Sequence, residues 1–389
     1  MDIGVAIWQS DNHSDGGVES MTQIVVRMHR ARPIVITQRE TPRTQRWRDR
    51  GIEVHVLPSA YEAWSESPAG IRHLPRNNAW MASLVRRRGI RVVHMNDLRA
   101  FANLGAGARA AGARLIFNVR DVKPGVEPYR LIWRIAATAS DHVVALSHEM
   151  AQDLETRLRG FFGTPPVSYF YSVVDLDRMT VVSDSGRRAL RERLGLEPGR
   201  VILPYVAAFN AKKAQLPFIE QALPVLVRKL PTALVCFVGD FRPDTDDYAR
   251  RCADAVFAHG LGAHVRFVGY SPAIADWLGA AEAVLLASRN EGLARCMIEA
   301  LARGTPVVSF DVCSAREMLE EHDCGFVVRQ GDYAGMVDEI VRLATDPVLK
   351  ERLGRNGARL ARELFEPSRV VARYEDLYLR IATGENTRG

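Results

Sequence analysis

The sequence predicts an α/β protein with two parallel-sheet domains. Its 389 residues make a long chain for a single hydrophobic core. Short apolar runs alternate with segments of helical apolar spacing in both halves, which is the pattern of parallel α/β architecture. A polar stretch over residues 183–186 opens the second series, and Pro198-Gly199 breaks the chain before its first strand. We therefore predict Rossmann-like domains over residues 1–178 and 179–365, followed by a C-terminal segment over residues 366–389.

The first series contains six apolar runs that are typical of buried strands. They cover residues 3–8, 33–37, 53–57, 92–95, 115–119 and 142–146. Helices are expected between them, among them residues 21–29 and 80–88. The second of these helices ends in three consecutive arginines, so it could lie on a membrane surface. Because it directly precedes a strand, a crossover helix with a basic exposed end is the favoured interpretation.

The second series begins with an amphipathic segment over residues 187–196. Its predicted strands cover residues 201–206, 233–238, 265–268, 283–286 and 306–310. The C-terminal segment has apolar residues at helical spacing and predicts a last helix.

Composition places the chain among water-soluble proteins. Apolar residues make up 47% and charged residues 25%, and no apolar run reaches the length of a membrane span. The chain opens on a strand pattern, whereas a signal peptide needs a basic start and a longer apolar core. The five cysteines are odd in number and include no C-x-x-C pair, which favours reduced thiols over metal ligands. We expect a cytoplasmic protein.

The net charge of +6 lies entirely in the first half of the chain. Residues 1–180 hold 24 Lys and Arg against 18 Asp and Glu, while the remainder holds 28 of each kind. A basic face there suits the inner surface of an anionic membrane, in peripheral contact, or a phosphorylated acceptor. Solvated arginines explain the same excess equally well. No nucleic-acid partner is expected.

The most informative segment, residues 287–311, places Glu291 and Glu299 eight residues apart across a loop-to-helix junction. Parallel sheets bind ligands beyond the carboxyl ends of their strands, where Glu291 would lie beside helix amides that start at Gly292. An ionised carboxylate only accepts hydrogen bonds. Next to a phosphate, the two glutamates are therefore expected to hold hydroxyl groups, such as those of a nucleotide sugar.

This segment resembles the nucleotide-sugar signature of retaining glycosyltransferases of family 4, and the resemblance extends over nearly the whole chain. It implies the GT-B fold, in which two Rossmann-like domains face a cleft and the C-terminal helix returns to the first domain. It also implies that Glu291 binds the donor sugar, Glu299 the ribose, and the backbone of Gly292 and Leu293 the diphosphate. The family often has glycine where this chain has Ala294, which could narrow the donor pocket.

Two further residue groups fit the resemblance. Gly16 and Gly17 match the glycine loop of the first domain, although a tight strand-to-helix turn also needs glycine. Lys213 matches the lysine that neutralises the donor diphosphate. The preceding family arginine is replaced by Ala208, and either Lys212 or Asn210 could take its place.

Arg120 stands where the family commonly has a histidine that contacts the transferred sugar. Arginine stays protonated, so it excludes a general base and fits a phosphate or an acidic acceptor. His94 is a further candidate at the end of its strand, with a core histidine as the alternative. Glu317 stands where many relatives have a glutamate, although a helix-start glutamate explains it equally well. Acceptor-binding loops are expected within residues 59–78 and 122–129.

The combined interpretation is a retaining transferase that uses a nucleotide-diphosphate sugar and an unidentified acceptor. No D-x-D pair suited to a metal diphosphate is found, so neither a metal nor a further cofactor is expected. Two alternatives stay open: an epimerase or hydrolase that acts on the nucleotide sugar, and a noncatalytic subunit that binds it.

Overall fold

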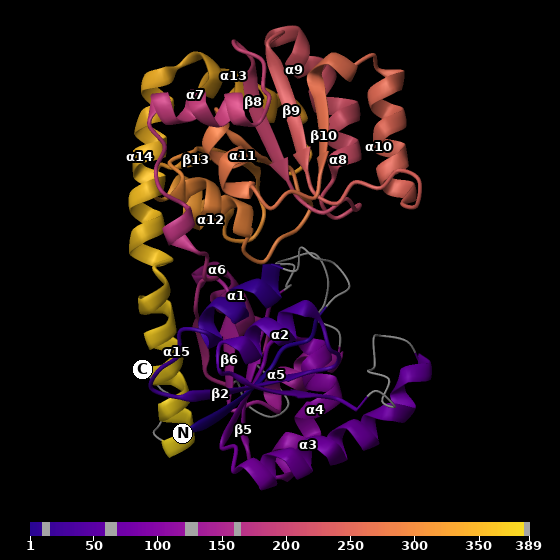
Figure 1. The fold of residues 1–389 in the computed structure, drawn as a ribbon, viewed down its shortest axis with the longest axis vertical. Helices are drawn as coiled ribbons and strands as arrows, with labels where there is room; N and C mark the ends of the chain where they lie inside the picture. Colours follow the sequence, from indigo (N-terminus) through magenta and orange to yellow (C-terminus); the bar gives the residue numbers. More distant parts are fainter. Residues whose placement is uncertain (10–15, 59–67, 121–130, 159–164, 385–389) are drawn as a thin grey trace. The chain divides into compact units, whose positions relative to one another are not determined.

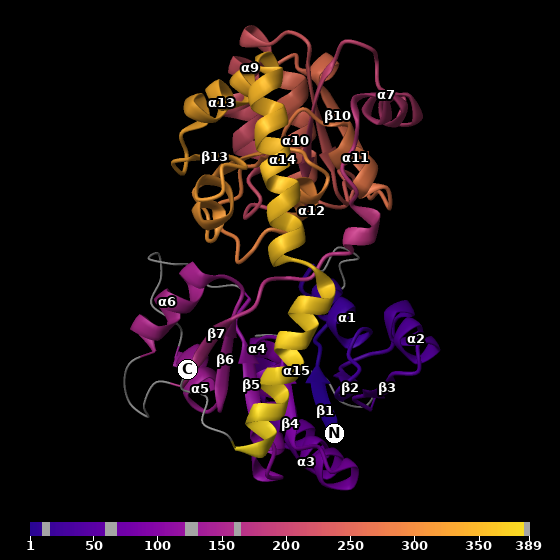
Figure 2. The ribbon, with the colours of Figure 1, turned by 90° about the vertical axis from the view of Figure 1, so that its left-hand side faces the viewer.

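The computed structural model describes residues 1–9, 16–58, 68–120, 131–158 and 165–384. The chain forms two compact units, which are Met1–Val173 together with Pro367–Gly389, and Val174–Glu366. In Figures 1 and 2 the chain can be followed from indigo at the N-terminus to yellow at the C-terminus. Each unit has its own parallel strands, flanking helices and apolar core, with one sheet in the first unit and two in the second.

The first unit is built on a parallel seven-stranded sheet with the order β3-β2-β1-β4-β5-β6-β7. The strands are β1 (Asp2–Ala6), β2 (Arg32–Thr37), β3 (Glu53–Val56), β4 (Val92–Met95), β5 (Arg114–Asn118), β6 (His142–Ala145) and β7 (Val167–Tyr169). The strand order changes direction at β1, which pairs with both β2 and β4. Open parallel sheets bind ligands at such a switch point, beyond the carboxyl ends of the strands.

Helices of the first unit connect these strands. They are α1 (Gly16–Val25), α2 (Pro42–Asp49), α3 (Leu74–Arg88), α4 (Leu98–Ala110), α5 (Leu131–Thr138), α6 (His148–Arg157) and α15 (Pro367–Thr383), with a 3₁₀ turn at Pro68–His73. Side-chain caps start several of them just after a strand ends. Asp97 accepts the N–H of Ala100 at α4, and Ser147 accepts the N–H of Met150 at α6.

The last helix, α15, belongs to the first unit, as the predicted fold class requires. It lies against α1 and β4, and its Tyr374 and Tyr378 are buried in the same core as these elements (Figure 2). Glu375 is fully buried and accepts hydrogen bonds from the N–H groups of His29, Arg30 and Ala31 at 2.8, 2.6 and 3.0 Å. Three backbone donors compensate the buried carboxylate and fasten the helix to the chain after α1.

His94 is a core residue of the first unit. Its Nδ1 lies 2.7 Å from the hydroxyl of Tyr378, and the side chain is fully buried. Burial, aided by the positive charge of Arg120, lowers the pKa of His94 to about 3. The imidazole is therefore neutral at physiological pH, and the core alternative considered for this residue is the correct one.

The second unit contains two parallel three-stranded sheets, with the orders β10-β9-β8 and β11-β12-β13. The strands are β8 (Val201–Val206), β9 (Ala233–Val238), β10 (Val265–Gly269), β11 (Val284–Leu286), β12 (Val307–Phe310) and β13 (Gly325–Val328). The edges formed by β8 and β11 adjoin: the N–H of Glu282 donates to the carbonyl of Ile202 at 3.0 Å, and the Glu282 carboxylate accepts the N–H of Ile202 at 2.7 Å. The carboxyl ends of β8 and β11 are thereby brought side by side.

Helices of the second unit cover these sheets around a core that includes Tyr205, Phe218 and Phe237. They are α7 (Asp184–Arg193), α8 (Gln215–Pro217), α9 (Leu223–Lys229), α10 (Asp247–Ala258), α11 (Ile274–Ala280), α12 (Arg295–Ala302), α13 (Tyr333–Thr345) and α14 (Pro347–Leu364). Short turns of 3₁₀ or π type occur at Leu176–Arg178, Phe218–Ala222, Gly262–His264 and Arg316–Glu320.

The structure differs from the sequence prediction at several elements. Strands β7 and β13 were not predicted, because each is a short edge strand of three or four residues, too short to stand out as an apolar run. Helix α1 begins at Gly16 and not at residue 21, so both glycines form part of its first turn. The predicted end of α1 at residue 29 is also wrong, since the helix ends at Val25.

Candidate functional site

Lys213 and Glu291 meet at the carboxyl edge of the second unit. Lys213 follows β8 and Glu291 follows β11, and these are the two strands whose edges adjoin. The Nζ of Lys213 lies 2.5 Å from Oε1 of Glu291. The Glu291 side chain is 8% exposed and that of Lys213 is 23% exposed, so the ion pair is largely withdrawn from water.

Backbone hydrogen bonds hold the loops that carry this pair. The N–H of Lys213 donates to the carbonyl of Asn210 at 3.0 Å and to its Oδ1 at 3.1 Å. The hydroxyl of Tyr205 donates to the carbonyl of Lys213, and the N–H of Arg289 donates to the carbonyl of Lys212 at 2.9 Å. Asn210 therefore organises the loop, and as a neutral amide it does not replace the positive charge that the family arginine carries.

The turn after Lys213 has an unusual backbone conformation. Ala214 has φ 55° and ψ 33°, in the left-handed region, where a residue with a Cβ is destabilised by about 1–2 kcal/mol. Gln215 then donates from Nε2 to the carbonyl of Ala208 at 2.8 Å. The backbone strain lies at the residue directly after Lys213, the candidate phosphate ligand, and such strain is common at functional sites.

Glu299 lies on α12 within the same group of side chains. Its Oε1 accepts from Nη2 of Arg295 at 2.9 Å, and both side chains are mostly buried. Burial raises the pKa of the Cys296 thiol to about 12, and the charges of Lys213, Glu291 and Glu299 also act on it. The charges of all three predicted residues therefore reach the same thiol, which indicates that they lie in one neighbourhood. Sequence reasoning missed Arg295, although its i, i+4 spacing from Glu299 was a usable signal.

The helix that follows Glu291 begins later than predicted. The sequence analysis placed helix amides from Gly292 onward, but α12 starts at Arg295, with Ala294 as an N-cap that has no side-chain hydrogen bond. Gly292 and Leu293 belong to the buried turn before it, and the Gly292 carbonyl accepts from Oγ of Ser314 at 3.0 Å. Ala294 has φ −70° and ψ 111°, which alanine adopts without strain, so the exchange of the family glycine is compatible with this turn.

The first unit contains a second group, made by Arg120, Gly17 and Asn96. A Cβ added to Gly17 would lie 2.8 Å from Nε of Arg120, so a side chain at that position would have to displace the guanidinium. Nη1 of Arg120 donates to Oδ1 of the buried Asn96 at 2.7 Å. These residues follow β5, β1 and β4, which are neighbours at the switch point of the sheet. Sequence reasoning missed Asn96, whose place at the end of β4 was the available signal.

This second group has the electrostatic character of an anion site. Arg120 is permanently protonated, and the N-terminus of the ten-residue helix α1 at Gly16 and Gly17 carries a positive partial charge. Asp121, the predicted acceptor loop at 122–129 and residues 59–67 of the predicted loop 59–78 lie outside the described residues. The rest of that second loop was predicted wrongly, because Pro68–His73 forms a 3₁₀ turn and α3 begins at Leu74. Glu317, a candidate by resemblance, is buried in the π-helical turn Arg316–Glu320.

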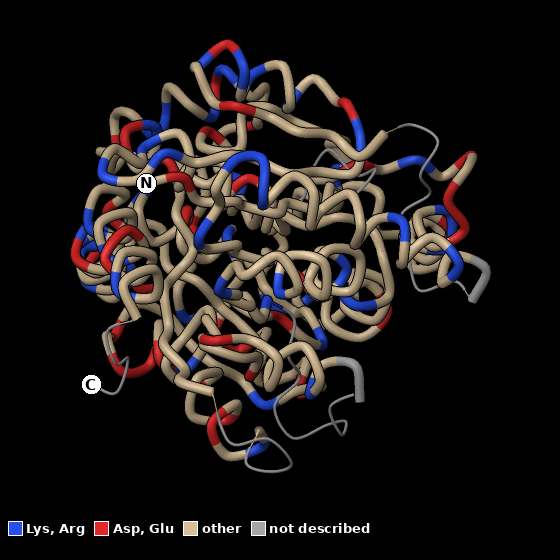
Figure 3. The backbone as a smooth tube through the Cα atoms, turned by 90° about the horizontal axis from the view of Figure 1, so that it is seen from below, with Lys and Arg blue, Asp and Glu red and all other residues tan. Residues whose placement is uncertain are grey.

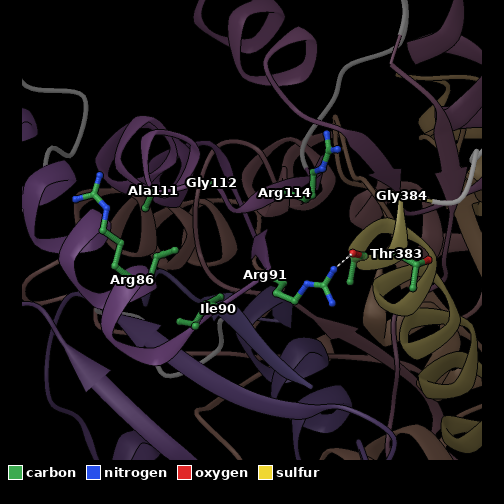
Figure 4. A pocket seen from close by; sticks show the side chains of 11 residues that line it. Arg86, Ile90, Arg91, Ala111, Gly112, Arg114, Thr383 and Gly384 are labelled. Carbon is green, nitrogen blue, oxygen red and sulfur yellow. Dashed lines mark hydrogen bonds between the residues drawn. The ribbon is translucent and has the colours of Figure 1, made fainter.

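A hollow of about 470 Å³ lies at the amino edge of the first sheet (Figure 4). Arg86, Arg91 and Arg114 line it, where the C-termini of α3, α4 and α15 converge. Nη2 of Arg91 donates to the carbonyl of Ala382 at 2.6 Å, and Nη1 of Arg114 donates to Asp141 at 2.9 Å. Part of the arginine charge therefore compensates helix C-termini, which carry negative partial charge.

The described residues contain neither a cluster suited to a metal ion nor a helix suited to crossing a membrane. Within 1–9, 16–58, 68–120, 131–158 and 165–384, no group of three or more His, Cys, Asp or Glu side chains is arranged to hold a metal ion. In the same ranges, none of the helices combines the length and the apolar character that crossing a bilayer requires.

Two protein-family models match the chain, one in each unit. The model of "Glycosyl transferases group 1" matches residues 186–360, and that of "Glycosyl transferase 4-like domain" matches residues 16–163. Together they account for both units. The chain belongs to the group 1 glycosyltransferases.

Curated relatives of this group 1 glycosyltransferase include the putative glycosyltransferase EpsD of Bacillus subtilis, 29% identical over 53% of this chain and 52% of EpsD. Another is the D-inositol 3-phosphate glycosyltransferase of Streptomyces avermitilis, 28% identical over 82% of this chain and 67% of the relative. The chain thus spans between about half and two thirds of the length of these relatives. The predicted family is confirmed.

Solved structures bear on the fold. Anabaena HepE in complex with UDP is 18% identical, has a TM-score of 0.79, and the match covers 97% of this chain and 99% of HepE. Sucrose-phosphate synthase from Thermosynechococcus elongatus is 17% identical, with a TM-score of 0.80 over 99% of this chain and all of that chain. At such identities the likeness concerns the fold alone, and it confirms the predicted GT-B class.

Proposed function

We propose that this group 1 glycosyltransferase moves a sugar from a nucleoside diphosphate sugar to an acceptor. The observation that carries the proposal is the contact of Lys213 with Glu291 beside Glu299, at the carboxyl edge where parallel sheets bind ligands. HepE, which shares the fold, was solved with UDP and with UDP-glucose, and this supports a nucleotide sugar as the donor.

Each residue has a role that suits its chemistry. The Lys213 ammonium would neutralise the charge that grows on the leaving diphosphate, and the amides at the start of α12 would add to it. Glu299 would accept hydrogen bonds from the ribose hydroxyls, and Glu291 from the donor sugar hydroxyls. The backbone of Gly292 and Leu293 would line the diphosphate side. With this positive charge, the site needs no metal ion.

Retention of configuration is proposed on the family resemblance. Retention is consistent with a front-face reaction. In this reaction the acceptor oxygen forms a bond to the anomeric carbon while the bond between that carbon and the diphosphate oxygen breaks. The acceptor proton passes to the leaving phosphate. Arg120 cannot remove that proton, because arginine stays charged. Together with the start of α1, Arg120 would instead hold a phosphate or carboxylate group, so an anionic acceptor fits best.

Nucleotide release that depends on an acceptor is the test of the transfer reaction. A thermal-shift panel of nucleotides and nucleotide sugars comes first, since a ligand at about 100 times its Kd stabilises a protein by about 2.7 kcal/mol. The donor that binds is then incubated with acidic and neutral acceptors, and the products are identified by mass. Conversion of the donor without an acceptor would favour the epimerase or hydrolase alternative. Binding without any turnover would favour a noncatalytic subunit.

We also propose that the first unit makes peripheral contact with anionic lipid. Basic and acidic residues are interspersed along the backbone (Figure 3), yet α3 ends in Arg86, Arg87 and Arg88 beside the arginine-lined hollow. Arginines near an anionic surface contribute about 1 kcal/mol each, and salt screens the attraction. We expect the protein to sediment with vesicles that contain anionic lipid at low salt and to be released as salt rises.

Two double substitutions, one in each unit, test which part of the protein contacts the anionic lipid. The double substitution Arg86→Glu with Arg87→Glu should abolish sedimentation. Arg228→Glu with Arg251→Glu makes the same change of charge on two exposed arginines of the second unit and should leave sedimentation intact. Equal sedimentation with neutral and anionic vesicles would contradict the proposal.

A further inference from the structure

The ion pair between Lys213 and Glu291 joins two residues that the proposed function assigns to different parts of the donor. Lys213 is assigned to the diphosphate and Glu291 to the sugar hydroxyls. In the structure the two side chains bind each other, with Nζ of Lys213 2.5 Å from Oε1 of Glu291. The loops that carry them are tied together by the hydrogen bond from Arg289 to Lys212, so the pair joins two fixed segments.

Electrostatics sets a condition on donor binding. A phosphate that approaches the Lys213 ammonium meets the carboxylate of Glu291, which already neutralises that charge. Two anions beside one partly buried cation repel each other, and little water is present to screen them. The diphosphate and the Glu291 carboxylate therefore compete for the Lys213 ammonium.

We infer that Glu291 is an internal placeholder for the diphosphate: its carboxylate pairs with Lys213 and is exchanged for the phosphate when the donor binds. The inference rests on the proposed function and gives a reason why the site would bind the nucleotide sugar more tightly than the nucleoside diphosphate. A complete nucleotide sugar offers phosphate to Lys213 and hydroxyl groups to Glu291, so both groups gain new partners. A spent nucleoside diphosphate offers only the phosphate and leaves a carboxylate without its cation.

The placeholder thereby favours release of the product. After sugar transfer, Glu291 loses its hydroxyl partners and can return to Lys213, which competes with the bound diphosphate. The same residue would thus position the sugar in one step and help expel the nucleotide in the next. A glutamine at this position keeps the shape and the hydrogen-bonding capacity but removes the competing charge.

The experiment measures binding by calorimetry, with UDP or GDP, whichever binds the wild type. Glu291→Gln is expected to tighten nucleoside diphosphate binding by about tenfold, and to narrow the preference for nucleotide sugar over nucleoside diphosphate. In a Lys213→Met background the same substitution should bring no gain, because the placeholder acts through Lys213. Glu320→Gln, which removes an exposed charge of the second unit, should leave the affinity unchanged.

The outcomes separate the inference from the proposed function. Unchanged or weaker nucleoside diphosphate binding in folded Glu291→Gln would overturn the placeholder. A gain of the same size in the Lys213→Met background would also overturn it, since the carboxylate would then act directly on the nucleotide. Either result leaves the proposed function standing if the wild type still transfers sugar. A wild type that binds no nucleotide and transfers no sugar would overturn the proposed function itself.

Discussion

Replacing Lys213 by alanine is expected to lower the rate of sugar transfer by about 100-fold to 1000-fold, the usual effect of removing one group that stabilises transition-state charge. The leaving diphosphate gains negative charge as its bond to the sugar breaks, and the Lys213 ammonium is the cation placed at this edge of the sheet. Because the contact strengthens as that charge grows, the effect should appear in kcat and not only in KM. Steady-state kinetics with saturating donor measures it.

Lys212 provides the matched control. It precedes Lys213 in the same loop, and its carbonyl, not its ammonium, is what the structure ties to Arg289. Lys212→Ala should therefore reduce kcat much less. Equal losses in the two variants, or a larger loss at Lys212, would show that the diphosphate lies against the other lysine. Removal of Lys213 also leaves Glu291 as a buried carboxylate without its cation, so each rate has to be referred to folded protein.

The strands were predictable where the sheet is buried on both faces. β1, β4 and β9 are short runs in which apolar residues predominate, and their predicted positions agree with the structure to within two residues. β7 and β13 escaped prediction because edge strands bury fewer residues. The start of α1 was placed too late because glycine disfavours helix interiors, whereas Gly16 and Gly17 lie in its first turn, where the cost is small.

The candidate site was predictable residue by residue but not as an arrangement. Glu291 and Lys213 were both chosen from local patterns, yet the contact between them depends on β8 lying beside β11, and the two residues are 78 positions apart in the sequence. No local pattern contains that adjacency. In the same way Arg120 was expected to bind an anion, while its hydrogen bond to Asn96 and its close approach to Gly17 follow from the order of β1, β4 and β5.

The nucleotide subsite is expected to depend on Glu299. If its carboxylate accepts hydrogen bonds from the ribose hydroxyls, Glu299→Ala should weaken nucleoside diphosphate binding by about 1.5–3 kcal/mol, the range for hydrogen bonds to a charged group. That corresponds to a rise in Kd of about 10-fold to 150-fold. Calorimetric titration of wild type and variant with the same nucleoside diphosphate measures the change. An unaltered Kd in a folded variant would remove Glu299 from the subsite.

Arg295 allows a sharper form of the same test, because its guanidinium binds the carboxylate of Glu299. If Glu299 served only to hold Arg295 in place, Arg295→Ala would weaken the nucleotide as much as Glu299→Ala does. A direct contact predicts a different pattern, in which a nucleotide that lacks a ribose hydroxyl binds the wild type more weakly but binds Glu299→Ala as well as the complete nucleotide does. Glu299→Ala should therefore no longer distinguish the two nucleotides, whereas Arg295→Ala should still distinguish them. This pair of results would assign the ribose hydroxyls to the Glu299 carboxylate, since an effect through Arg295 would respond to the diphosphate and not to the sugar.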